Sequence, residues 1–163
     1  MLFVIGGDGT HRGAIYLSKL LRNCGQPVVL AGIPKTIDND VSFIDFSFGF
    51  RSAVEEAVRA ILAAKTEAKS LKNGVGVVKL MGRYAGYIAC HASIASGAVD
   101  LCLIPELKIR ISGPNNHFDH LRRVLGTRGH AVVVVAEGAG EQLLGEGCVG
   151  KHTFSSPACR GVA

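Results

Sequence analysis

Tryptophan is absent from this sequence of 163 residues, which has only seven phenylalanines and three tyrosines. So few aromatic residues argue against a platform on which single-stranded nucleic acid stacks. Lysine and arginine are scattered and form no basic stripe. The formal net charge of +5 therefore suits a solvated surface or small anionic ligands such as phosphorylated metabolites. No apolar run is long enough to span a membrane, so we expect neither nucleic acid nor membrane as partner.

The sequence also lacks any CxxC pair. Its odd number of cysteines indicates neither a zinc site nor a disulfide framework, and Cys90 and Cys102 are expected to be small core hydrophobes. Free cysteines suit a reducing compartment, and residues 1–5 have neither the basic region nor the cleavage site of a signal peptide. We expect a cytoplasmic protein, with a plastid as the alternative. The cysteines are Cys24, Cys90, Cys102, Cys148 and Cys159.

Short apolar runs alternate with amphipathic stretches along the chain. We expect Pro34 to end the second strand and Asn116 to cap the last helix. The alternation is typical of an α/β fold, a three-layer Rossmann-like parallel sheet with helices on both faces. The apolar runs predict buried strands at residues 2–5, 28–33, 75–81, 101–104 and 131–136. Helices are predicted at residues 14–21, 48–71, 84–96 and 116–128.

Two predictions concern how the helices are buried. His91 lies in an apolar helix and is expected to be a core histidine. The long helix shows one apolar stripe that should face the sheet. This stripe consists of Val54, Ala57, Val58, Ile61 and Leu62.

Every polar motif directly follows a predicted strand. Open α/β sheets bind ligands at the carboxyl ends of their strands, so this coincidence predicts a binding site at that edge. In strand order, the motifs are residues 6–10, residues 34–40, Gly82-Arg83, Pro105-Glu106 and Glu137-Gly138.

The first motif, Gly6-Gly7-Asp8-Gly9-Thr10, joins a strand to a helix. Backbone N–H groups at such a junction point at phosphate oxygens, and the helix dipole favours the anion. Asp8 is suited to Mg²⁺, which takes one or two carboxylates together with phosphate oxygens. Thr10 would cap the helix or bind phosphate. The alternative is a tight turn with an N-cap.

The second motif is Pro34-Lys35-Thr36-Ile37-Asp38-Asn39-Asp40. Phosphoryl transfer needs positioned groups, charge neutralisation and an acceptor for the proton of the attacking hydroxyl, and a carboxylate suits that task. A solvated acidic turn is the alternative. After the third strand, Arg83 would stabilise negative charge in a transition state or would be an exposed residue at a helix start.

Residues 34–40 closely resemble the catalytic loop of the phosphofructokinase family. Residues 81–86, Met81-Gly82-Arg83-Tyr84-Ala85-Gly86, are similar to the family segment that contacts fructose 6-phosphate and the transferring phosphoryl group. The glycine motif alone is shared with NAD kinases and diacylglycerol kinases, but the other two segments argue against both. The subtype match is closest to the ATP-dependent enzymes of plants and trypanosomes.

The resemblance implies roles for individual residues. Asp38 would be the base for the sugar 1-hydroxyl, supported by Thr36 and Asp40, and Arg83 would act in catalysis. Glu106 matches a position linked to effector binding in short bacterial forms. The sugar phosphate would contact Thr36, Asp38, Met81, Gly82, Arg83 and Glu137. ATP and Mg²⁺ would bind at Gly7, Asp8, Gly9, Thr10 and Lys35, with Asp8 as the metal ligand.

Two positions bear on the phosphoryl donor. Relatives that use diphosphate have Asp where this sequence has Gly9, and a carboxylate there would repel the α-phosphate of ATP. Lys35 points the other way, because diphosphate enzymes have Lys at its position. The plant and trypanosome enzymes combine Gly with Lys and use ATP, so we expect ATP.

The resemblance covers residues 2–147. It implies part of a nucleotide domain at 1–49 and part of a sugar-phosphate domain at 50–147, before a divergent, disordered tail at 148–163. The expected function is ATP-dependent phosphorylation of fructose 6-phosphate in glycolysis, by a dimer or tetramer. The alternatives are a diphosphate-dependent enzyme and a non-catalytic truncated paralogue. Because family members are at least twice this long, we expect no turnover by the 163-residue chain alone.

Overall fold

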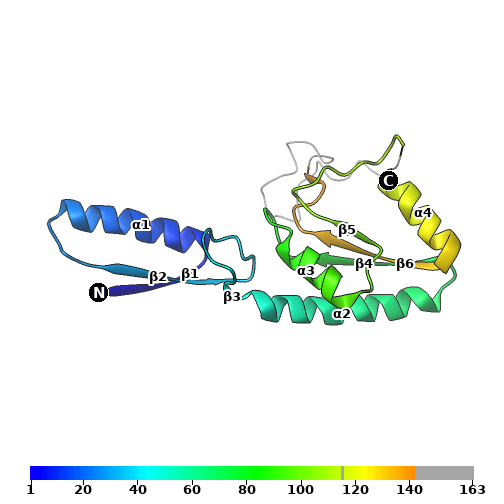
Figure 1. The fold of residues 1–163 in the computed structure, drawn as a ribbon, viewed down its shortest axis with the longest axis horizontal. Helices are drawn as coiled ribbons and strands as arrows, with labels where there is room; N and C mark the ends of the chain where they lie inside the picture. The colour runs from blue at the N-terminus through cyan, green and yellow to red at the C-terminus, as the bar shows by residue number, and fades with distance from the viewer. Residues whose placement is uncertain (115, 142–163) are drawn as a thin grey trace, which may run out of the picture. The chain divides into compact units, whose positions relative to one another are not determined.

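This computed structural model describes residues 1–114 and 116–141 (Figure 1). The chain forms two sheets, each of three parallel strands. One compact unit is formed by Met1–Glu56, and a second begins at Ala57. Strands and helices alternate along the chain except at two consecutive strands in the first unit, and all paired strands are parallel, which confirms the predicted α/β fold. The predicted tail at 148–163, with its two cysteines, lies outside the described residues.

The first unit contains a sheet of order β1-β2-β3. The two longer strands pair in parallel from Leu2 opposite Leu30 to Gly6 opposite Pro34. The long helix α2 (Phe50–Ser70) follows directly after the third strand. The other elements are β1 (Leu2–Gly6), α1 (Asp8–Asn23), β2 (Leu30–Thr36) and β3 (Phe48–Gly49).

Strand β2 runs through Pro34, so the prediction that this proline ends the strand is wrong. Pairing with β1 stops at Pro34, and pairing with β3 begins at the next residue, Lys35. A proline has no N–H to donate and is tolerated where a sheet ladder is interrupted. The regular strand therefore carries the chain as far as Thr36.

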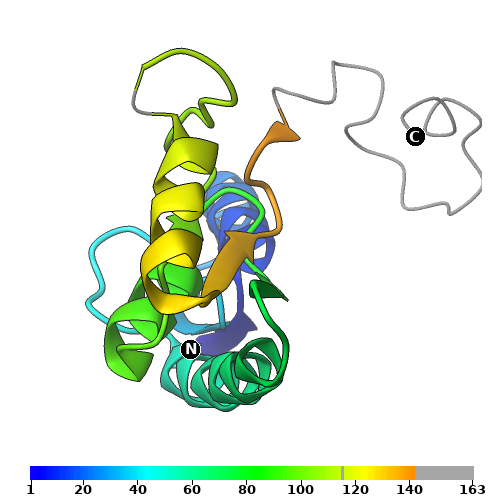
Figure 2. The same ribbon diagram turned by 90° about the vertical axis from the view of Figure 1, so that its right-hand side faces the viewer.

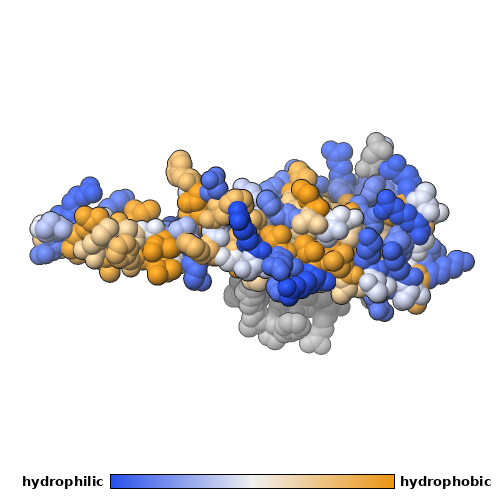
Figure 3. All heavy atoms as spheres, turned by 60° about the horizontal axis from the view of Figure 1, so that its bottom comes forward, coloured by the Kyte–Doolittle hydropathy of each residue, from blue (hydrophilic) through white to orange (hydrophobic). Residues whose placement is uncertain are grey.

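Helix α1 covers one face of this sheet. It comes so close that a Cβ built on Gly32 would lie 2.7 Å from Nδ1 of His11. Phe3 and Ile5, which alternate with the covered residues along β1, are each 60% exposed, and Figure 3 shows apolar side chains over the surface of this unit. The prediction of a fully buried first strand is therefore wrong, because one face carries no helix among the described residues.

The second unit contains a sheet of order β4-β6-β5 with all strands parallel. The central strand β6 has four consecutive buried residues, 131–134, because it has a neighbour on each side and contacts both α3 and α4 (Figures 1 and 2). The elements are β4 (Gly74–Leu80), α3 (Tyr87–Ser96), β5 (Leu101–Leu103), α4 (His117–Arg128) and β6 (His130–Ala136).

The stripe that helix α2 buries differs from the predicted one. Ala57, Ile61 and Ala68 are 5%, 0% and 3% exposed, and the backbone of Ala68 lies against Gly74 at the start of β4. Leu62 is 45% exposed, although it belongs to the predicted stripe. Spacings of four and seven residues keep one face toward the sheet, whereas Leu62 is turned away by about 100°.

The structure also corrects smaller predictions and confirms one. Helix α3 begins at Tyr87 instead of residue 84, and residues 48–49 form β3 instead of a helical turn. His91 is exposed, so its assignment to the core is wrong. Asn116 does cap α4, because its side chain accepts a hydrogen bond from the Asp119 N–H at 2.9 Å.

One further observation concerns membranes. Within residues 1–114 and 116–141, no helix has both the length and the apolar character needed to cross a bilayer.

Candidate functional site

The glycine turn after β1 leads directly into helix α1. Gly7 is the N-cap residue, with φ −86° and ψ −166°, and no side chain caps the helix there. The helix starts at Asp8, so Thr10 lies in its first turn and is not the cap. The first N–H groups of a helix have no partner within it, and its dipole makes this end positive. This end of α1 therefore has the properties that a phosphate needs.

Asp8 lies in the first turn and forms an ion pair with Arg12, with 2.9 Å between Oδ2 and Nε. The side chains of Asp8 and Arg12 are 45% and 79% exposed, respectively. Among the described residues, no three His, Cys, Asp or Glu side chains gather as metal ligands. A single half-exposed carboxylate still fits Mg²⁺, because that ion takes its remaining ligands from water and phosphate oxygens.

The acidic loop after β2 lies against the glycine turn. A Cβ built on Gly7 would lie 3.5 Å from Cβ of Thr36, which is an ordinary contact distance. The Asp38 N–H donates a hydrogen bond to Oγ1 of Thr36 at 3.2 Å. The structure thus brings the predicted residues Gly7, Thr36 and Asp38 together, while Lys35 and Asp40 are exposed at either end of this segment.

Ser47 closes the acidic loop from the other side. It is 5% exposed, and its Oγ donates a hydrogen bond to the Thr36 carbonyl oxygen at 2.6 Å. The Ser47 N–H donates to Oδ1 of Asn39 at 2.8 Å, and Nδ2 of Asn39 donates to the Asp45 carbonyl oxygen at 3.1 Å. Asn39 has a φ of 55°, a conformation that asparagine tolerates better than most residues. These bonds fix the path of the loop that contains Asp38.

Sequence reasoning did not identify Ser47. A signal was nevertheless available, because a single serine stands between Phe46 and Phe48. Alternating residues of an extended segment point to opposite sides, so a polar residue between two aromatic ones suggests a specific hydrogen-bonding role. The structure has the aromatic pair 49% and 66% exposed, with the serine buried between them.

In the second unit, the loops after β4 and β6 are hydrogen bonded to each other. The Glu137 N–H donates to the Leu80 carbonyl oxygen at 2.8 Å, and the Gly138 N–H donates to the Gly82 carbonyl oxygen at 3.2 Å. A side chain on Gly138 would collide with the backbone of Arg83, so only glycine permits this approach. The structure thus brings predicted residues from two loops together.

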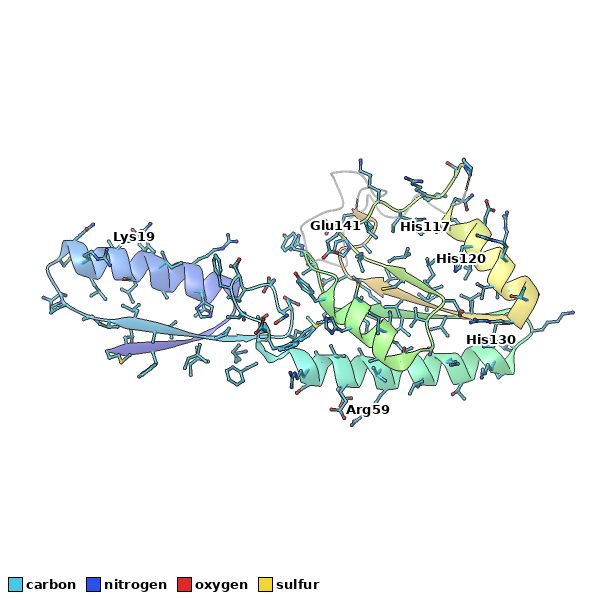
Figure 4. All side chains as sticks on the ribbon, viewed as in Figure 1. Lys19, Arg59, His117, His120, His130 and Glu141 are labelled. Atoms are coloured by element: carbon cyan, nitrogen blue, oxygen red, sulfur yellow. The ribbon has the colours of Figure 1, made fainter. Side chains whose placement is uncertain are left out.

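Arg83 lies between an aromatic ring and a carboxylate. Its guanidinium carbon is 5.1 Å from the centre of the Tyr84 ring, and its Nε is 3.9 Å from Oε1 of Glu141. Glu141 follows β6 and is labelled in Figure 4. These residues and Glu106 line a pocket of about 240 Å³. Sequence reasoning missed the part played by Glu141, because it lies beyond the strand-end motif and has no motif of its own.

Cys90, in α3, and Cys102, in β5, lie close to each other. Burial, and next the neighbouring Cys102, raise the pKa of the Cys90 thiol above its ordinary value. The thiol therefore stays protonated at neutral pH. Both cysteines are half-buried instead of fully buried core residues, because they lie where α3 meets β5 at the edge of the sheet.

The predicted site residues thus fall into two groups, one in each unit. Gly7, Asp8, Thr36 and Asp38 belong to the first, and Arg83 belongs to the second together with Met81, Gly82 and Glu137. A single catalytic centre that contains both groups remains a prediction.

Comparison with known proteins identifies the family. A family model described as phosphofructokinase matches residues 1–155. The chain belongs to the phosphofructokinase family. It is 53% identical over 145 residues to ATP-dependent 6-phosphofructokinase 1 of Arabidopsis thaliana, covering 89% of this chain and 31% of that protein. It is 54% identical over 144 residues to the chloroplastic ATP-dependent 6-phosphofructokinase 5 of the same plant, covering 88% and 27%, respectively.

A solved member of the family has the same fold. The crystal structure of a pyrophosphate-dependent phosphofructokinase from Marinobacter aquaeolei matches with a TM-score of 0.67 and 28% identity. The match covers 84% of this chain and 36% of that one. The chain thus spans about a third of the length of the curated relatives it matches.

Replacement of the buried serine tests whether it fixes the acidic loop. Ser47→Ala should lower the free energy of unfolding by about 1–3 kcal/mol, because it leaves the Thr36 carbonyl without its partner. Chemical denaturation of the full-length protein measures this loss. Ser42→Ala, at an exposed position in the same loop, should change stability by less than about 0.5 kcal/mol. Equal effects of the two substitutions would contradict the role given to Ser47.

Proposed function

We propose that this protein is an ATP-dependent 6-phosphofructokinase, which transfers the γ-phosphoryl group of ATP to the 1-hydroxyl of fructose 6-phosphate in glycolysis. The observation that carries the proposal is the contact between the glycine turn and the acidic loop. The Thr36 side chain lies so near Gly7 that a Cβ built on the glycine would be 3.5 Å from Cβ of Thr36, and its Oγ1 accepts a hydrogen bond from the Asp38 N–H. A phosphate at the helix start would therefore lie beside a carboxylate.

The reaction requires groups that this chain can supply. Asp38 accepts the proton of the attacking hydroxyl, which makes the sugar oxygen a better nucleophile. Arg83 stabilises the charge on the equatorial oxygens of the transferring group, as a planar guanidinium suits phosphate. Asp8 holds Mg²⁺, which neutralises the donor phosphates when bound. Glu137, after β6, orients the sugar hydroxyls.

The proposed donor is ATP. Within the described part of the chain, no atom outside the neighbouring residues and the local helix backbone lies within 4 Å of a Cβ built on Gly9, so the space beside the first turn of α1 is open for the nucleotide's α-phosphate. The names of the two Arabidopsis relatives also specify ATP. Diphosphate is the second candidate, favoured by Lys35 and by the pyrophosphate-dependent enzyme among the similar structures.

The proposed cellular location of the enzyme is inferred from its relatives. They include a chloroplastic protein, so a plastid location stands beside the cytoplasmic one. A dimer or tetramer remains the proposed assembly. A non-catalytic paralogue is the other class of function, and it would bind nucleotide without transferring phosphate.

Replacement of the proposed base tests the function directly. Full-length protein should convert fructose 6-phosphate and ATP to products in a coupled assay, and Asp38→Asn should reduce kcat by about a hundred- to ten-thousandfold. Asparagine keeps the size of the side chain but cannot accept the proton. Asp45→Asn, in the same loop, is the control and should keep most of the activity. Undiminished turnover by the Asp38 variant would refute the assigned base, and an inactive wild type would favour the paralogue.

A second substitution tests the choice of donor. Gly9→Asp should raise the KM for ATP by roughly tenfold or more, because a carboxylate beside the α-phosphate repels it. Diphosphate, which has no α-phosphate with a nucleoside attached, should be affected less.

Gly13→Asp is the matched control, since it adds the same charge one turn further along α1. Neither added Cβ meets an atom of residues 1–114 or 116–141 within 4 Å beyond its own stretch of helix, so both variants should fold. If both substitutions weakened ATP equally, the effect would come from overall charge and the donor argument would fail.

A further inference from the structure

The Glu106 carboxylate lies beside the start of helix α3. Its Oε1 accepts a hydrogen bond from the Gly86 N–H at 2.7 Å, and Gly86 is the N-cap residue of this helix. The first N–H groups of a helix lack partners within it, so the carboxylate satisfies one of the donors at this end. Its negative charge strengthens this bond and interacts favourably with the helix dipole.

The contact depends on the absence of a side chain at Gly86. Gly86 is buried, and a Cβ built on it would lie 2.6 Å from Cβ of Ile104 and 2.9 Å from Oε2 of Glu106. The end of β5 and the start of α3 are therefore packed directly against each other. The carboxylate reaches the helix start because no side chain stands between them.

The turn that precedes α3 is thus held at both ends. Its first residue, Gly82, accepts a hydrogen bond from the Gly138 N–H at 3.2 Å, and its last residue, Gly86, donates to Glu106. Arg83 lies between these two attachments. Loss of either attachment would let the backbone of the turn shift, and the guanidinium would shift with it.

The charge of Glu106 opposes direct binding of a phosphate. Its carboxylate lines the same pocket as Arg83 and Glu141, and it would repel an anionic ligand there. Its effect on such a ligand is therefore expected to pass through the backbone of the turn. This distinguishes Glu106 from Arg83, whose charge would attract the ligand.

We propose that Glu106 is a positioning residue that orients Arg83 for fructose 6-phosphate by holding the Gly86 N–H. This inference rests on the proposed function. It differs from the role implied by the family resemblance, in which Glu106 would contribute to effector binding.

Three substitutions in the full-length protein separate these roles. Glu106→Gln keeps an oxygen acceptor at the same reach, Glu106→Asp keeps the charge but shortens the side chain, and Glu106→Ala removes both. In the Ala and Asp variants, we expect the KM for fructose 6-phosphate to be roughly tenfold or more above the wild-type value, while the KM for ATP stays within about twofold of wild type. The Gln variant should stay within about threefold of wild type. Glu67→Ala, at an exposed position on α2, is the control.

The opposite order of the variants would overturn the proposal. If activity were retained in Glu106→Asp and lost in Glu106→Gln, the charge and not the hydrogen bond would be essential. An unchanged KM for fructose 6-phosphate in Glu106→Ala would also overturn it. If the Ala variant fails to fold, comparing the Gln variant with the Asp variant still shows whether the hydrogen bond or the charge is essential.

Amide hydrogen exchange tests the contact without relying on activity. The Gly86 N–H should exchange at least about tenfold faster in Glu106→Asp than in wild type, and Glu106→Gln should retain most of the protection. Equal protection in all variants would refute the contact. Because this measurement needs no turnover, it distinguishes failure of the positioning role from failure of the proposed kinase function.

Discussion

The hydrogen bond from Ser47 to the Thr36 carbonyl is the constraint on which the first unit's site depends. It joins the end of β2 to the residue before β3, so that the loop between them returns to the sheet. The same serine binds Asn39, which holds the middle of the loop. With the loop fixed in this way, the Thr36 side chain faces the glycine turn and the Asp38 N–H bonds to it.

In the second unit, hydrogen bonds likewise fix the segments that follow the three parallel strands. The loop after β6 bonds to the loop after β4, and Glu106 after β5 bonds to the start of α3. Parallel strands place their carboxyl ends at one edge of a sheet, so residues from distant parts of the sequence meet there. The ion pair between Arg83 and Glu141, 3.9 Å long and with both side chains 36% exposed, contributes little to stability. These backbone and carboxylate hydrogen bonds therefore do more than the ion pair to place Arg83 beside the pocket.

Much of this fold was predictable from the sequence. The five apolar runs and the helices between them indicated the α/β class, and the motifs after each strand predicted binding residues at the carboxyl ends of the strands. The N-cap role of Asn116 followed from its side chain and its place before an amphipathic helix. These features depend on local sequence, which is why they could be predicted.

The sequence-based predictions were wrong where residues distant in the sequence determine the local structure. Pro34 lies within a strand because the ladder changes partner at that point, and nothing nearby in the sequence reveals this. Leu62 is exposed because the sheet meets α2 on a neighbouring stripe, and His91 is exposed although its helix is apolar. For the same reason, the bond between Glu106 and Gly86, twenty residues apart, was not predicted.

We propose that a phosphoryl donor binds where the glycine turn meets the acidic loop. A crystal structure of the full-length protein with a non-hydrolysable ATP analogue, Mg²⁺ and fructose 6-phosphate tests it most directly. The account predicts phosphate oxygens at the N–H groups that start α1 and the sugar 1-hydroxyl within hydrogen-bond reach of Asp38. A nucleotide bound elsewhere, with the Asp38 carboxylate remote from the sugar, would contradict it.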